Sequence, residues 1–181
     1  MIVLGIDPGT RRLGWGVVER RGTRFVHRAH GVIKTDERQA IAYRLVTIEC
    51  ELVEVVRAHA PIVASVEALF YAKDAQAAAK LGHARGVVLL VCARAGLDVY
   101  EYAPALVKRA VAGSGRAEKA QVAQMIRVVL GLSSPPPSDA ADALALAVTH
   151  LQRPQALITL PAGRERGVQS PEGGIKRGPS G

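Results

Sequence analysis

The chain has 181 residues, of which 49% are apolar and 22% are charged, and its formal net charge is +8. This length suits one domain with a sizeable core, and the composition excludes a chain that is disordered throughout. The basic excess favours a polyanionic partner such as nucleic acid, although an ordinary solvated basic surface explains the charge equally well.

The cysteines and the apolar segments indicate the compartment. Cys50 and Cys92 lack a metal-type spacing, and each lies in an apolar-rich helical segment, so we expect two buried thiols in a reducing environment. The N-terminal apolar run lacks both the length and the basic start of a signal peptide, and no run is long enough to span a bilayer. We therefore expect a cytoplasmic protein without membrane association.

Three strands are predicted at the start of the chain. Residues 2–7 form an apolar run that leads into a turn-forming Asp-Pro-Gly sequence, as a buried strand does. Two further short runs, over residues 13–19 and 24–33, flank a turn at Arg21-Gly22. The three segments together predict an antiparallel meander.

Helices and strands alternate after residue 40. Apolar residues recur at three- and four-residue steps from Ile41 to Val56, which predicts an amphipathic helix that ends before Pro61. Gly82 and Gly86 lie on one face of a later helix and permit close approach of another backbone, from the sheet or from a partner helix. The other predicted elements are strands over 62–67 and 97–101 and helices over 74–95, 104–112, 118–130 and 139–151.

This order of elements predicts an α/β fold in which helices cover the faces of a mixed sheet. From about residue 154 onward Gly, Pro, Ser, Arg and Glu dominate, and hydrophobic periodicity disappears. We therefore predict one folded domain over residues 1–153 and a disordered tail over residues 154–181.

Four carboxylates stand out by their positions. Asp7 ends the first predicted strand, Glu67 ends the fourth, and Asp139 and Asp142 lie three residues apart on one face of the last helix. Sites in open α/β sheets gather outside the carboxyl ends of the strands. If the first and fourth strands are parallel neighbours, Asp7 and Glu67 project from the same edge, where a short loop also brings the helix.

Converging acids repel one another unless a cation lies among them, and Mg²⁺ prefers oxygen ligands. Two such ions about 4 Å apart activate a water and stabilise the leaving oxygen of a phosphodiester. Each acid also has an ordinary explanation: Asp7 suits a turn, Asp139 suits a helix start with Ser138 as its N-cap, and Asp142 suits an exposed helix face. Glu67 is harder to explain this way because it closes an apolar strand.

Four segments resemble, in order, the RuvC family of Holliday-junction resolvases. They are Gly5-Ile6-Asp7-Pro8-Gly9, Val66-Glu67-Ala68-Leu69-Phe70 with Lys80-Leu81-Gly82-His83-Ala84-Arg85-Gly86 after it, Ala117-Glu118-Lys119-Ala120-Gln121-Val122, and Ser138-Asp139-Ala140-Ala141-Asp142-Ala143-Leu144-Ala145. His150 also falls where the family has a histidine. The resemblance covers roughly residues 1–151 without large gaps.

The resemblance implies a ribonuclease H-like fold with a mixed five-stranded sheet, so residues 1–153 would be a RuvC-like nuclease domain. It implies a magnesium-dependent endonuclease that acts as a homodimer and makes paired cuts in a four-way DNA junction during recombination and repair. The ligands of two Mg²⁺ ions per active site, which Mn²⁺ can replace, would be Asp7, Glu67, Asp139 and Asp142. Some members carry histidine at the position of Asp139, so the aspartate here bears on metal preference. The branch-migration complex RuvA-RuvB is a further partner that the resemblance suggests.

The resemblance also implies DNA contacts. Phe70, followed by Tyr71, falls where the family has an aromatic that stacks on a base near the crossover, whereas a core aromatic is the ordinary alternative. Lys108 and Lys119 match positions linked to DNA contact or catalysis, and Arg116 follows a glycine-containing turn that suits a phosphate. Solvated helix faces and an ordinary interhelical turn are the alternatives for these basic residues.

Three other functions compete with a junction resolvase. Gly5-Ile6-Asp7-Pro8-Gly9-Thr10 also resembles the first phosphate loop of actin-like ATPases and sugar kinases, but the chain is too short for their two domains and lacks a second Asp-x-Gly loop. A DNA-binding protein without catalysis has no reason to keep four clustered acids. A related ribonuclease H-like nuclease that acts on another branched DNA or on RNA remains the realistic alternative, since acids report the reaction and not the substrate.

Overall fold

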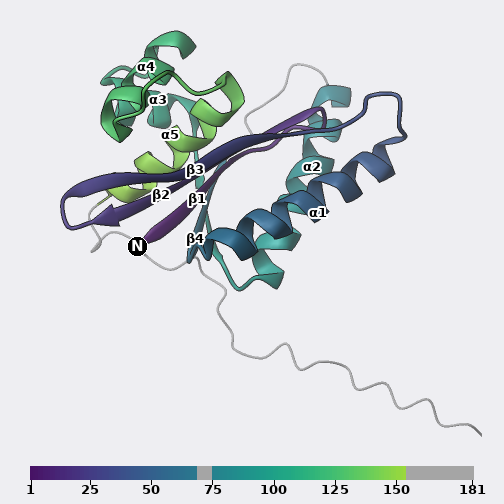
Figure 1. Ribbon diagram of the computed structural model, residues 1–181. Coiled ribbons are helices and arrows are strands. Elements are labelled where there is room, and N and C mark those ends of the chain that lie inside the picture. The colour runs from purple at the N-terminus through teal and green to yellow at the C-terminus, as the bar shows by residue number, and fades with distance from the viewer. Residues whose placement is uncertain (69–74, 154–181) are drawn as a thin grey trace, which may run out of the picture.

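The computed structural model describes residues 1–68 and 75–153, and a five-stranded sheet forms its centre. Figure 1 shows the sheet between the helices. The strand order is β3-β2-β1-β4-β5. β1 pairs antiparallel with β2 and parallel with β4, β2 pairs antiparallel with β3, and β4 pairs parallel with β5. The strands are β1 (Ile2–Asp7), β2 (Arg12–Arg21), β3 (Arg24–Lys34), β4 (Val63–Glu67) and β5 (Asp98–Tyr102).

Helices cover both faces of the sheet, so that the domain has three layers (Figure 1). On one face, Ile48 and Leu52 of α1 and Val88 of α2 share a buried cluster with the strands. On the other face, α3, α4 and α5 contribute to a second buried cluster. The helices are α1 (Ile41–His59), α2 (Ala75–Arg94), α3 (Pro104–Ala112), α4 (Lys119–Leu130) and α5 (Ser138–Gln152).

α5 packs directly on the sheet because both surfaces carry small residues. A Cβ atom added at Gly5 of β1 would lie 1.9 Å from the carbonyl oxygen of Ala143, and one added at Gly14 of β2 would lie 1.9 Å from that of Asp139. The buried hydroxyl of Ser65 in β4 donates a 2.9 Å hydrogen bond to the carbonyl of Leu146. These contacts fix the height of α5 above the strands and therefore the position of its N-terminal turn.

The predicted α/β class, the mixed five-stranded sheet and the order of all ten elements are confirmed. The N-cap of α5 was predicted wrongly: Ser138 is already inside the helix, Pro137 is the N-cap, and no side chain bonds there. Cys92 is buried as expected, but Cys50 is exposed, because it lies on the opposite side of α1 from Ile48 and Leu52.

The glycines of α2 do not serve packing within the described chain. A Cβ atom at Gly82 or Gly86 meets nothing within 4 Å, so the expected approach of the sheet at these positions is wrong and a partner helix stays a prediction.

Across the described residues, none of the helices has the length and apolar character to cross a membrane. Phe70, Tyr71 and the predicted tail over residues 154–181 lie outside the described residues.

Candidate active site

Asp7 and Glu67 close two neighbouring parallel strands. In the register between β1 and β4, Ile6 pairs with Val66, so the next residues along the two strands are the two acids. The first and fourth strands are therefore parallel neighbours, which was the condition for these acids to project from the same edge of the sheet. Both side chains are half-buried.

The N-terminal turn of α5 lies over this edge. Asp7 pairs with Gly14 of β2, and Gly14 lies against the backbone of Asp139. One turn further along α5, Asp142 shares a pocket with Glu67. The two strand ends and the helix start thus bring the four predicted acids into one region.

Burial and mutual repulsion act on the acids of the strand ends. The pKa of Asp7 is raised from 3.8 to about 7, first by burial and then by the charges of Glu67 and Asp142, with Asp139 adding to them. Burial, followed by the charge of Asp142, also raises the pKa of Glu67. The site therefore carries more negative charge than its surroundings stabilise, as a cation-binding site does.

Two basic side chains partly compensate this charge. The Nε of Arg12 lies 2.6 Å from the Oδ2 of Asp139, and the Nζ of Lys119 lies 2.9 Å from the Oδ2 of Asp142. The hydrogen bond to Asp142 raises the pKa of Lys119, and Lys119 in turn opposes the raised pKa values of Asp7 and Glu67. Both acids of α5 are thus held by cationic side chains.

A pocket of about 210 Å³ opens beside the acids. Glu67 and Asp142 lie on one side of it, and Lys108 and Lys119 contribute basic groups. The rest of the lining is apolar and comes from α3, α4 and α5. It consists of Pro104, Val107, Val122 and Leu146. The pocket therefore joins acids that suit metal ions to lysines that suit a phosphate.

Comparisons with known proteins show the family to which the chain belongs. Residues 3–150 match the family described as "Crossover junction endodeoxyribonuclease RuvC". The chain belongs to the RuvC family. It is 64% identical to the crossover junction endodeoxyribonuclease RuvC of Sorangium cellulosum, over 83% of this chain and 84% of the relative. It is 52% identical to the protein of that description from Azorhizobium caulinodans, over 82% of this chain and 88% of the relative.

A solved structure of a RuvC protein has the same fold. The structure is described as T. thermophilus RuvC in complex with Holliday junction substrate, and it is 41% identical to this chain with a TM-score of 0.79. The match covers 83% of this chain and 93% of that one. The ribonuclease H-like architecture expected from the sequence is confirmed by this likeness together with the sheet topology.

The acids have the chemistry of metal ligands, but their side chains are not arranged as a preformed coordination site. Among residues 1–68 and 75–153, no three His, Cys, Asp or Glu side chains stand close enough together to hold an ion as they are. Asp139 and Asp142 are bonded to Arg12 and Lys119 instead. The donor set is nonetheless all carboxylate. Burial first, and the neighbouring acids second, raise the pKa of Asp7, and both effects fit a site for a hard divalent cation in this RuvC-family chain.

Sequence reasoning missed two basic residues that position the site. Arg85 of α2 is buried, donates a 2.6 Å hydrogen bond to the carbonyl of Glu67 and forms an ion pair with Glu101 of β5. It therefore holds the end of β4 in place. A basic residue next to the core position Ala84 was the available signal. No pattern in the sequence pointed to Arg12.

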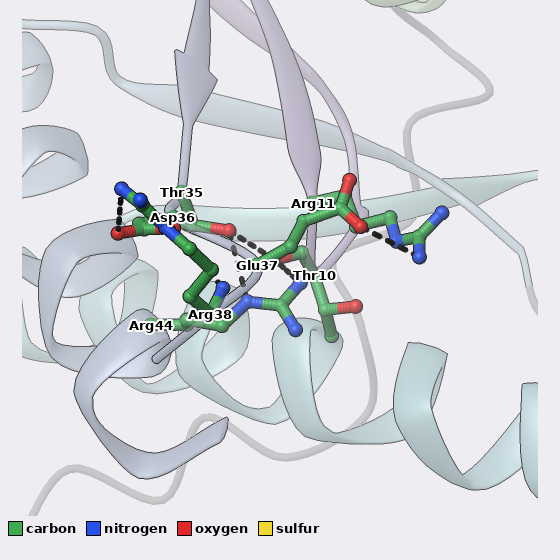
Figure 2. A network of polar contacts seen from close by, with 7 residues as sticks. All are labelled: Thr10, Arg11, Thr35, Asp36, Glu37, Arg38 and Arg44. Atoms are coloured by element: carbon green, nitrogen blue, oxygen red, sulfur yellow. Dashed lines mark hydrogen bonds and ion pairs between the residues drawn. The ribbon is translucent and has the colours of Figure 1, made fainter. Parts of the chain in front are cut away.

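A polar network fixes the segment that follows Asp7 (Figure 2). The hydroxyl of Thr35 donates a 2.7 Å hydrogen bond to the carbonyl of Thr10, and the guanidinium of Arg44 reaches both of these residues. Arg11 in the same segment pairs with Glu37. The network ties the turn after β1 to the segment that follows β3 and to α1, so the backbone that follows Asp7 is anchored.

Arg116 and His150 lie apart from the acids. Arg116 is exposed in the turn between α3 and α4 and is not among the residues that line the pocket. His150 lies at the other end of α5, where its Nδ1 is 2.7 Å from the hydroxyl of Tyr102. Burial lowers the pKa of His150 to about 4, so the imidazole is neutral at pH 7 and belongs to the core of this RuvC-family domain.

Proposed function

We propose that this chain is a magnesium-dependent crossover junction endodeoxyribonuclease that hydrolyses phosphodiester bonds of Holliday junctions in DNA recombination and repair. Membership of the RuvC family supports the proposal, because both curated relatives carry this activity in their descriptions. The junction bound in the matched Thermus structure supports the choice of substrate.

The observation that carries the proposal is the environment of Asp7. Its half-buried side chain closes a strand; burial raises its pKa most, the charges of Glu67, Asp142 and Asp139 raise it further, and it reaches about 7. Such an arrangement destabilises a protein unless a cation binds there. The lysines of the adjacent pocket offer a place for the phosphate on which the acids act.

The four acids are the proposed ligands of two Mg²⁺ ions per active site, for which Mn²⁺ can substitute. Bound divalent ions supply activation of the attacking water and stabilisation of the leaving oxygen. The protein itself contributes rigid placement: β1 and β4 hold Asp7 and Glu67, and α5 holds Asp139 and Asp142 on one face.

The proposed DNA contacts divide by their distance from the acids. Lys108 and Lys119 line the pocket and would contact the phosphate that is cut. Arg116 lies on the exposed turn and would contact the backbone outside the pocket. Phe70, with Tyr71 beside it, is the proposed stacking residue, a contact worth about 1–3 kcal/mol per base.

A homodimer with one active site per subunit accounts for paired cuts in opposing strands. Two sites held by one symmetric assembly meet two phosphates of a four-way junction in one encounter. RuvA-RuvB is the proposed branch-migration partner. The cytoplasm is the proposed compartment.

Cleavage of a synthetic four-way junction tests this function. We expect paired symmetric nicks in Mg²⁺ and in Mn²⁺, and no nicks with Asp7→Asn or on a linear duplex of the same sequence. Junction binding without cleavage in either ion would leave a non-catalytic DNA-binding protein. Cleavage of another branched DNA or of RNA, with the junction left intact, would keep the chemistry and reject the substrate.

A further inference from the structure

Two histidines contact each other on the edge strand of the sheet. The Nε2 of His27 lies 2.8 Å from the Nδ1 of His30, and the ring centroids are 4.9 Å apart. Both residues belong to β3, and both side chains are half-exposed. Two imidazole nitrogens therefore point at one another at a position that solvent reaches.

A bulge in β3 creates this pair. Residues three apart in a regular strand point to opposite faces, because side chains alternate. Here His27 pairs with Val18 while Ala29 pairs with Val17, so Arg28 is left without a partner on β2. The extra residue shifts the alternation and places His27 and His30 on the same face of the sheet.

The bulged residue is held away from the pair. The Nε of Arg28 lies 3.0 Å from the Oε2 of Glu19, and the same carboxylate also pairs with Arg21. Since Glu19 pairs with Val26, it shares the face opposite to His27. The ion pair thus draws the Arg28 charge toward the other face and leaves the two imidazoles as each other's polar partners.

We propose that His27 and His30 form a binding site for a transition-metal ion of the Zn²⁺ or Ni²⁺ type, separate from the four-acid site. Such ions accept imidazole nitrogen ligands, whereas Mg²⁺ prefers oxygen. The ligand atoms are Nε2 of His27 and Nδ1 of His30, and water completes the coordination.

The geometry needs only a small adjustment to accept an ion. Two nitrogens at about 2.0–2.1 Å from one tetrahedral ion lie roughly 3.3 Å apart, so the present 2.8 Å separation must widen by about 0.5 Å. Rotation of two half-exposed rings supplies this. The N···N hydrogen bond already requires one nitrogen to offer its lone pair. On binding, the proton in this hydrogen bond moves through solvent to the other nitrogen of its own ring, so both imidazoles stay neutral and both facing lone pairs are free for the ion.

The protonation states favour the ion. Burial lowers the pKa of His30, and burial together with the neighbouring His30 charge lowers that of His27, so both rings are neutral at pH 7. The pair is also separate from the acids, because β2 lies between β3, which carries the histidines, and β1, which carries Asp7.

Calorimetric titration of the full chain, without a histidine tag and in excess Mg²⁺, tests the site with NiCl₂ as the probe. We expect one Ni²⁺ per chain, and we expect its loss in His27→Gln and in His30→Gln. His83→Gln is the matched control, because it removes an exposed histidine from α2. Asp7→Asn should also keep the Ni²⁺ site, which separates this inference from the fate of the proposed nuclease.

Several results would reject the site: no Ni²⁺ binding by the unaltered chain, undiminished binding in His27→Gln, or equal loss in His83→Gln. Urea unfolding midpoints of the variants show whether each is folded. If one of the two substitutions prevents folding, the other decides, because either one removes half of the ligand pair. Nuclear magnetic resonance of the imidazole nitrogens provides the second readout, with shifts at His27 and His30 alone expected on addition of Zn²⁺.

Discussion

The guanidinium of Arg12 holds Asp139, with its Nε 2.6 Å from the Oδ2 of the carboxylate, and the pair joins the start of β2 to the first turn of α5. A proposed metal ligand is therefore occupied by a cation of the protein itself. An ion that binds through Asp139 has to compete with this guanidinium.

Replacement of Arg12 by alanine should ease metal binding. Because the competing cation is lost, we expect less Mg²⁺ to be needed for half-maximal junction cleavage, and tighter Mn²⁺ binding without DNA by electron paramagnetic resonance. Arg12→Lys keeps a positive charge and serves as the control. An unchanged Mn²⁺ affinity in Arg12→Ala would mean that the ion pair does not oppose the metal.

Asp7→Asn should stabilise the metal-free protein at high pH. The pKa of Asp7 is about 7 in the folded protein, whereas the ordinary value is 3.8. The protonated carboxyl therefore contributes fully to the free energy of unfolding below pH 3.8, and this contribution is lost as the pH rises through about 7. The difference between the variant and the unaltered chain then reaches at most about 4 kcal/mol at pH 8.

Urea unfolding in EDTA at pH 4 and at pH 8 measures this effect. The gain from Asp7→Asn should be present at pH 8 and absent at pH 4, and added Mg²⁺ should reverse the order by stabilising only the unaltered chain. A gain of the same size at both pH values would show that the substitution acts through packing and not through charge.

Lys119→Met should raise the pKa values of Asp7 and Glu67, whereas a bound cation would lower them. Lys119 opposes the raised pKa values of Asp7 and Glu67, so its loss raises both further, and the acidic limb of the pH–rate profile for cleavage should shift to higher pH. Carboxyl carbon resonances titrated without metal provide a direct measure. Lys119→Arg should leave the titration of Asp7 nearly unchanged; the same shift in that variant would point to altered structure.

The sequence predicted the parts of the site that follow from strand and helix period. Asp7 and Glu67 end apolar runs, and parallel pairing of those runs sets the two acids side by side. For α5, the sequence predicted that Asp139 and Asp142 share one helix face, but not the contacts that hold this face over the strand ends. The pair of Arg12 and Asp139 joins residues 127 apart in the sequence, and no local pattern encodes it.

The bulge in β3 was equally hidden from the sequence. A strand over residues 24–33 was expected, but period-two alternation places His27 and His30 on opposite faces, and only the register against β2 reverses this. Cys50 illustrates a different limit: an apolar-rich helix exposes one side, and composition alone does not say which residues lie there. Packing between distant segments decides each of these cases.

Gly14→Ala should lower both stability and activity, because the first turn of α5 packs directly against Gly14 of β2 next to the acids. A methyl group there would lie 1.9 Å from the carbonyl oxygen of Asp139, so the first turn of α5 must move away from β2. We expect a loss of about 1–3 kcal/mol in the free energy of unfolding, as is typical of overpacking. Since Asp139 moves with the helix, junction cleavage should fall by roughly tenfold or more even at temperatures where the variant is fully folded. Urea unfolding and cleavage rates at saturating Mg²⁺ measure the two effects, and a folded variant with undiminished cleavage would show that the site tolerates displacement of α5.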